Sequence, residues 1–346
     1  MGFYLFFISS LYFAHSLSMV NYFPYFYTKK ENIIFKIGKG EVGMKKKKKI
    51  WYGLVIISLL VFAAACSEIK PPSQTASEQT QETKKESSSE LVYDPPKMED
   101  LEGKDDPLSE SIKRGYIYVN ESNTALDQYV GNQLSCTSCH AGAGVGEASS
   151  LVGVTAISPE YNPRAAKVMS IEDRINGCMV RSMNGEKLPL DSQELRDMVS
   201  YLQYISKGVP IGADIPWRKQ NSMKVEDLPE TDLALGEEIY KQSCAACHGA
   251  DGEGIGANSG PAVWGENSFN DGAGLARLST ATKFIQRNMP IGQEGSLSVQ
   301  EAANVAAYIL SHDRPKWKGR ENDWPKGGAP TDSPYYHELK SVKEGL

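Results

Sequence analysis

The sequence predicts an all-α protein with two tandem domains of similar size. First, the pattern C-x-x-C-H occurs twice, at 136–140 and at 244–248, 108 residues apart. Second, a segment with helical character precedes and another follows each copy. Third, about 240 residues remain beyond a polar N-terminal stretch, which is enough for two small domains.

Four helices are expected to frame the two motifs. We predict opening helices at 111–120 and 233–242 and closing helices at 193–206 and 300–311, because apolar residues recur there at helical spacing. Gly115 and Gly236 lie in the opening helices, where a missing side chain lets two helices cross closely.

The C-x-x-C-H pattern is the attachment signature of c-type haem. The two thiols form thioethers to the haem, and the histidine is the proximal iron ligand. A redox dithiol or half a zinc site is disfavoured, because the pattern occurs twice with an adjacent histidine. The sequence therefore predicts two class I cytochrome c domains, each with one covalent haem c. The predicted attachment residues are Cys136, Cys139, Cys244 and Cys247, with His140 and His248 as ligands.

The N-terminal region resembles a bacterial lipoprotein signal. Five lysines follow Met44, an apolar run spans 50–62, and three alanines precede Cys66. We expect a signal peptide at 44–65 and a lipidated Cys66 that anchors an extracytoplasmic protein to the cell membrane. A transmembrane anchor is the alternative. Residues 1–43 are interpreted as translated upstream DNA or, alternatively, as an extra hydrophobic segment.

Composition and turn residues set the remaining boundaries. Residues 66–107 are rich in polar residues and are expected to form a disordered tether. We place domain 1 at 108–208, a proline-containing linker at 209–231, domain 2 at 232–314, and an irregular surface extension at 315–346.

Net charge restricts the class of partner. Removing residues 1–65 leaves 28 basic and 41 acidic residues, a net charge of −13. This charge argues against a nucleic-acid partner. An anionic substrate would have to be attracted by local arginines against the overall field.

The distal ligands distinguish the two haems. Met289 lies 41 residues after His248 and is predicted as the distal ligand of haem 2. A carbonyl near Gly260-Pro261 is expected to accept the proximal imidazole N–H. For haem 1 the sulfur candidates are Met169, Cys178, Met179, Met183 and Met198. The internal repeat favours Met183 and the unpaired thiol favours Cys178, so the residues alone leave these two open.

Several short motifs occur together in the folded part of the chain. They lie at 129–132, 171–178, 181–185, 188–189, 247–252, 264–265, 272–274 and 288–293. Their combination, over about residues 109–316, resembles the thiosulfate dehydrogenase (tetrathionate-forming) and tetrathionate reductase family of dihaem cytochromes c. The resemblance implies that Cys178 is the distal ligand of the active-site haem, that Arg164 lines the substrate pocket, and that haem 2 passes electrons onward. Asn288 departs from relatives that have lysine there, which puts ligand switching at haem 2 in doubt.

The resemblance implies oxidation of two thiosulfates to tetrathionate, which is reversible in some members, with a cytochrome or respiratory complex as electron acceptor. Arg174, Cys178 and Ser182 are spaced to share one helical face, which would carry a cation, a thiolate and a hydroxyl. The arginines could instead pair with haem propionates. The alternative function is a membrane-tethered electron carrier with two His/Met haems. A third is oxidation of another small sulfur compound.

Overall fold

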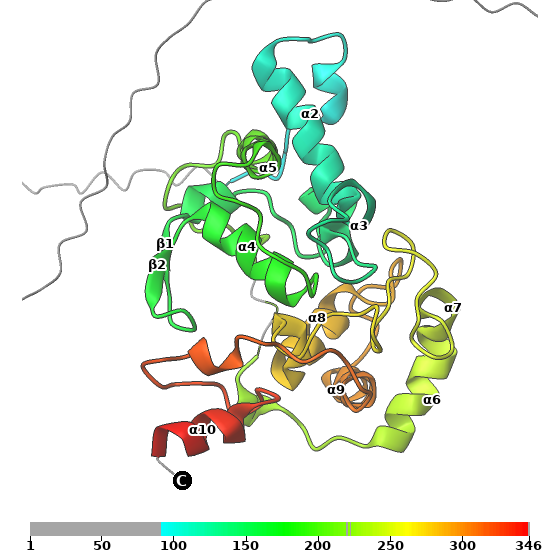
Figure 1. Ribbon diagram of the computed structural model, residues 1–346. Helices are drawn as coiled ribbons and strands as arrows, with labels where there is room; N and C mark the ends of the chain where they lie inside the picture. Colours follow the sequence, from blue (N-terminus) through cyan, green and yellow to red (C-terminus); the bar gives the residue numbers. More distant parts are fainter. Residues whose placement is uncertain (1–90, 219–220, 222, 345–346) are drawn as a thin grey trace, which may run out of the picture. The chain divides into compact units, whose positions relative to one another are not determined.

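The computed structural model describes residues 91–218, 221 and 223–344 (Figure 1). The predicted extension at 1–43, the signal peptide at 44–65, Cys66 and most of the predicted tether lie outside the described residues. The helices of the described part are α2 (Pro107–Asn120), α3 (Ser122–Ala125), α4 (Ile171–Arg181), α5 (Gln193–Ile205), α6 (Leu233–Ser243), α7 (Ala245–His248), α8 (Leu278–Asn288), α9 (Val299–Leu310) and α10 (Tyr336–Glu344). One antiparallel hairpin joins β1 (Glu160–Asn162) to β2 (Lys167–Met169). The predicted all-α class is confirmed.

Each half is built around the crossing of its opening and closing helices, α2 with α5 and α6 with α9. A Cβ atom on Gly115 would lie 2.0 Å from the carbonyl oxygen of Asp197, and one on Gly236 would lie 2.2 Å from that of Asn304. Both distances are far below van der Waals contact. The close crossing that the two glycines predict is therefore confirmed.

Polar side chains fix where several of these helices begin. Asp106 accepts hydrogen bonds from the backbone N–H groups of Leu108 and Ser109, and Pro107 occupies the first helical position. This cap starts α2 four residues earlier than the apolar pattern predicts. Ser170 caps α4 in the same way, by accepting a hydrogen bond from Asp173 N–H.

The two halves share packing and hydrogen bonds. Phe269, Ala273 and Ala276 of the second half belong to the apolar core of the first. The Asn270 side chain donates to the carbonyl oxygen of Val180 at 2.9 Å, and Asn132 donates to that of Ser268 at 3.0 Å. The halves therefore form one compact unit, and their relative placement is set by these contacts.

Two expectations about the segments outside the domains are wrong. Residues 91–107 are not a free tether, because Leu101 is 5% exposed in the core and Tyr93 hydrogen-bonds Ser150. The extension after residue 314 is not wholly irregular, because it ends in α10 and forms an apolar cluster around Trp324 and Tyr335. Within the described ranges, no helix has the length and apolar character that a membrane span requires.

We predict that Gly115→Ala and Gly236→Ala each destabilise the protein by about 1–3 kcal/mol, because the added methyl group forces the crossing helices apart. Thermal unfolding of the holoprotein measures the effect. Gly274→Ala is the control, since a Cβ there meets no atom within 4 Å, and its melting temperature should stay near that of the wild type. Equal stability of all three variants would contradict the role assigned to the two crossings.

Candidate functional site

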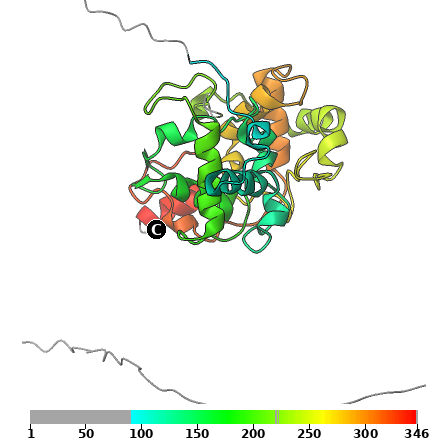
Figure 2. The ribbon, with the colours of Figure 1, turned by 90° about the horizontal axis from the view of Figure 1, so that it is seen from above.

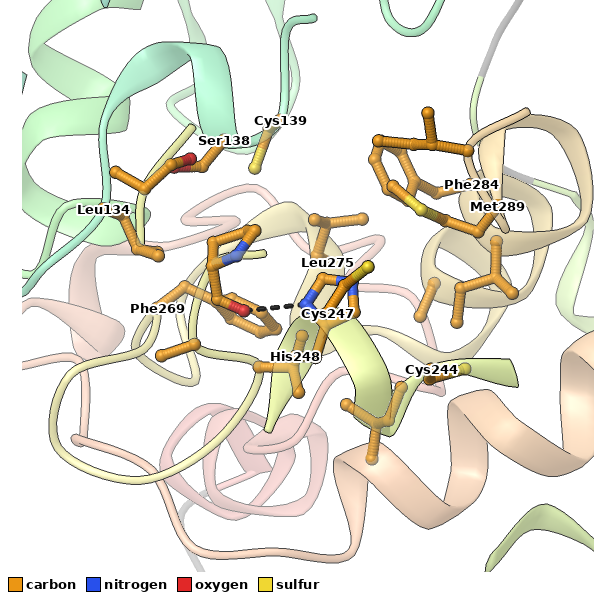
Figure 3. Close-up of a pocket in the computed structure, with 18 of the residues that line it drawn as sticks. Leu134, Ser138, Cys139, Cys244, Cys247, His248, Phe269, Leu275, Phe284 and Met289 are labelled. Carbon is orange, nitrogen blue, oxygen red and sulfur yellow. Dashed lines mark hydrogen bonds between the residues drawn. The ribbon is translucent and has the colours of Figure 1, made fainter. Parts of the chain in front are cut away.

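The C-terminal half holds a cavity of about 360 Å³ lined by Cys244, Cys247, His248 and Met289 (Figure 3). The imidazole Nδ1 of His248 donates to the carbonyl oxygen of Pro261 at 2.7 Å, as the sequence predicts. This bond fixes the tautomer in which Nε2 is free to bind a metal. Thiols, imidazole and thioether lining one cavity fit a covalently attached haem with His/Met ligation.

The N-terminal half holds a second cavity of similar size, about 320 Å³, lined by Cys136, Cys139 and His140. Here Nδ1 of His140 donates to the carbonyl oxygen of Ser149 at 2.6 Å. The two thiols are free, and Nε2 of the imidazole is again available. The residues of this cavity therefore also fit one covalent haem c.

The sulfur atoms around the first cavity differ in exposure. All five candidate sulfurs line the cavity. Cys178 is exposed, whereas Met183 is 2% exposed and also packs in the apolar core. Met179 and Met198 are buried as well, and Met169 at the end of β2 is partly exposed. Although Cys178 is exposed to the cavity, the surrounding protein atoms desolvate its thiol and raise its pKa, and the guanidiniums of Arg174 and Arg181 oppose that shift.

The repeated helices place Met183 and Met289 in similar but not identical positions. Helices α4 and α8 both contain 11 residues, and Met289 immediately follows α8. The residue that immediately follows α4 is Ser182, and Met183 comes one position later. Each methionine nevertheless lines the cavity of its own half.

Charge distinguishes the two cavities most clearly. Four arginines line the first cavity: Arg164, Arg174, Arg181 and Arg218. No aspartate or glutamate is among its lining residues, and Ser182 adds a hydroxyl. The lining of the second cavity contains no aspartate, glutamate, lysine or arginine, and His248 is its one titratable nitrogen base. A cavity with this set of cations favours small anions, whereas the second offers them no charged partner.

The helix face that the sequence predicts is present. Arg174 and Cys178 lie on α4, Ser182 is its C-terminal cap residue, and all three line the first cavity. Arg174 also forms an ion pair with Glu160 of β1. Arg164, from the turn between β1 and β2, reaches the same cavity.

Sequence reasoning missed two of the four arginines. Arg181 lies on α4 seven residues after Arg174, so the helical spacing could have identified it. Arg218 lies in the segment interpreted as a linker, where no periodicity places it. Its guanidinium donates to the carbonyl oxygen of Ser150 at 3.3 Å, and no carboxylate of the described residues forms an ion pair with it. Burial and the neighbouring Arg174 lower its pKa to about 10.

The two cavities adjoin each other. Leu134 and Cys139 line both of them, although these residues belong to the N-terminal half. In the close-up of the second cavity, Cys139 and Leu134 stand beside the residues around His248 (Figure 3). Groups held in the two cavities would therefore lie close to one another.

Comparisons with known proteins agree with this architecture. Residues 127–211 match the family described as "SoxA/TsdA, cytochrome c domain", and residues 231–309 match "Cytochrome C oxidase, cbb3-type, subunit III". The thiosulfate dehydrogenase of Psychrobacter arcticus is 40% identical over 233 residues, which cover 66% of this chain and 71% of that protein. The one from Allochromatium vinosum is 40% identical over 228 residues, or 63% and 84% of the two chains.

A solved structure shows the same relationship. The thiosulfate dehydrogenase TsdBA of Marichromatium purpuratum superposes with a TM-score of 0.59 at 32% sequence identity. The match covers 64% of this chain and 49% of that chain, so the present chain spans about half of the solved one. The two halves are tandem cytochrome c domains that carry two covalently bound haem c groups. The chain belongs to the thiosulfate dehydrogenase family.

Proposed function

We propose that the protein is an oxidoreductase that joins two thiosulfate ions to form tetrathionate. One sulfur–sulfur bond forms, no proton is exchanged, and two electrons leave the substrates for a cytochrome or respiratory acceptor. The observation that carries this proposal is the first cavity, where four arginines surround the exposed Cys178 without an acidic side chain in the lining.

The arginines of the first cavity offset the repulsion between the two substrate anions. Thiosulfate carries two negative charges, and two such ions must approach to bonding distance. At 4 Å two unit charges repel by about 4 kcal/mol at the effective dielectric constant near a protein surface. Planar guanidinium groups donate paired hydrogen bonds to the oxygens of anions, and so hold them while offsetting their charge. This requirement explains why cations concentrate at one cavity of an acidic protein.

We propose Cys178 as the distal ligand in the first cavity and Met289 in the second. Exposure supports this pair: Cys178 is exposed and Met289 is half-buried, whereas Met183, which also lines the first cavity, is 2% exposed. When bound, each haem accepts one electron, and a thiolate ligand lowers the potential whereas methionine raises it. The different ligands therefore suit one site for chemistry and the other for passing electrons on.

The side chain of Asn288 supports a fixed ligand in the second cavity. Asn288 is buried and donates to the carbonyl oxygen of Phe284 at 2.9 Å, within its own helix α8. An amide held in this way does not compete with Met289 for iron. We infer that ligation of haem 2 does not depend on an exchange with residue 288.

We further propose that the mature protein is extracytoplasmic and anchored to the cell membrane through a lipid on Cys66. The support is the sequence of residues 44–66, with its lysines, apolar run and small residues before the cysteine. Attachment of c-type haem outside the cytoplasm agrees with this location.

We predict that thiosulfate reduces the oxidised holoprotein and that tetrathionate oxidises the reduced form at least partly, because the same cavity binds both anions. Visible absorption of the haems reports each reaction. Chloride at matched ionic strength is the control for charge screening. If neither compound changes the spectrum, the protein is an electron carrier without substrate chemistry.

We predict that Cys178→Ala loses one low-spin ferric EPR signal and most thiosulfate-dependent turnover, because the thiolate is removed from the first cavity. Met183→Leu is the matched control and should retain both signals, since Met183 is core packing. An unchanged spectrum in Cys178→Ala, with a signal lost in Met183→Leu, would transfer the ligand role to Met183. Met169→Leu tests the remaining accessible sulfur in the same way.

We predict that Arg174→Ala raises KM for thiosulfate roughly tenfold to hundredfold, which corresponds to the loss of charge-assisted hydrogen bonds worth about 1.5–3 kcal/mol. Steady-state kinetics with an artificial electron acceptor measure the change. Arg196→Ala is the control, because Arg196 lies on the exposed side of α5 and binds only the carbonyl oxygen of Asp191 in the described structure. Equal KM values for the two variants would contradict a substrate-binding role for Arg174.

A further inference from the structure

The segment after domain 2 returns to the cavity of domain 1. Helix α9 ends at Leu310, and the segment that leads from it to α10 passes near the turn of the β1–β2 hairpin (Figures 1 and 2). The backbone N–H of Trp324 donates to the carbonyl oxygen of Arg164 at 2.7 Å, which fixes this approach. The C-terminal segment 315–344 therefore follows domain 2 in sequence and contacts both domains in space.

One carboxylate in this segment binds two of the cavity arginines. Oδ2 of Asp323 accepts a hydrogen bond from Arg164 Nη2 at 2.8 Å, and Oδ1 accepts one from Arg181 Nη2 at 2.7 Å. Arg164 comes from the β1–β2 turn and Arg181 from the last turn of α4. A single buried group thus fixes cations from two separate elements of domain 1.

Aromatic side chains of the same segment also hold the two arginines; together with Asp323 they form what we call the clamp: Trp317, Asp323, Trp324 and Tyr335. The hydroxyl of Tyr335 donates to Asp323 at 2.7 Å and also accepts from Arg164. The indole of Trp324 lies 4.6 Å from the guanidinium carbon of Arg164, and that of Trp317 lies 4.9 Å from that of Arg181. Each guanidinium is therefore held by the shared carboxylate and by one aromatic face.

The charges of this cluster favour its stability without neutralising the cavity. Burial raises the pKa of Asp323, but the Arg164 and Arg181 guanidiniums outweigh burial and hold that pKa below its ordinary value. The carboxylate is thus ionised, and its one negative charge is paired with the two positive charges of Arg164 and Arg181. The remaining positive charge is available to an anion. The Nε atoms of Arg164 and Arg181 are buried and have no hydrogen-bond partner among the described residues, so Asp323 holds these guanidiniums through their Nη atoms alone.

We propose that Asp323 is a positioning residue, which holds Arg164 and Arg181 at the substrate cavity in the orientation that binds the sulfur anions. The C-terminal segment 315–344 is then part of the active site of domain 1. This inference rests on the proposed function for its kinetic consequences, and on the hydrogen bonds and stacking above for its geometry.

The experiment compares Asp323→Asn with Glu338→Gln in the full-length holoprotein. Glu338 is the matched control, because it lies in the same segment and pairs with Arg320 at the exposed surface, away from the cavity. Loss of the Asp323 charge leaves both guanidiniums free to turn away. We expect KM for thiosulfate to rise at least about tenfold with a smaller change in kcat, whereas Glu338→Gln stays within about twofold of the wild type.

The midpoint potential of haem 1 gives a readout that does not depend on turnover. Removing a negative charge near this haem should raise its potential and leave haem 2 unchanged. If Asp323→Asn matches Glu338→Gln in both KM and potential, the proposal is overturned. If wild-type protein does not react with thiosulfate, the proposed function fails, and a haem 1 potential that is equal in Asp323→Asn and Glu338→Gln would then overturn the placement of Asp323 beside this site.

Tyr335→Phe covers the case in which Asp323→Asn does not accumulate as holoprotein. It removes one hydroxyl from the clamp and keeps every charge. A KM increase of about threefold or more, at unchanged haem content and melting temperature, supports positioning. A KM equal to that of Glu338→Gln overturns it.

Discussion

The crossing of the first and last helices in each half is the contact on which the rest of the structure depends. Gly115 and Gly236 let α2 and α6 reach the backbones of α5 and α9, so the ends of each half are fixed against each other. The segments between these helices then line each cavity with a C-x-x-C-H motif and with the proposed distal ligand. Because both halves share this pair of crossing helices, the differences between their cavities arise from the segments that lie between the helices or after them.

Those segments give the two cavities opposite electrostatic character. Burying a guanidinium is costly unless a partner compensates it, and most proteins avoid placing several together. Here Asp323 compensates Arg164 and Arg181, and Glu160 compensates Arg174, while the second cavity contains no such group. The arrangement is understandable if one cavity receives doubly charged anions and the other only passes electrons. Structure and charge therefore divide the work of one chain between two related domains.

Local features of the sequence predicted most of the fold and part of the site. The haem motifs, the four framing helices and the face with Arg174 and Cys178 all depend on residues close together in the chain. The clamp around Asp323 could not be predicted, because Asp323 lies 159 residues from Arg164 and in a stretch without periodicity. Arg218 was missed for the same reason. The disorder expected for 91–107 is wrong because a few residues, Leu101 and Met98 in the core and Tyr93 through Ser150, hold a polar stretch against domain 1.

The position of Cys139 between the two cavities affects the redox properties expected of the protein. Cys139 borders both cavities, so haem groups held in them would lie close together, with protein in place of water between them. An oxidised group in one cavity would make removal of an electron from its neighbour harder, because its extra positive charge would act over a short distance. The two oxidation steps would then be spread over a wider range of potential than in isolated domains. A single chain can in this way match a two-electron donor to one-electron acceptors of differing strength.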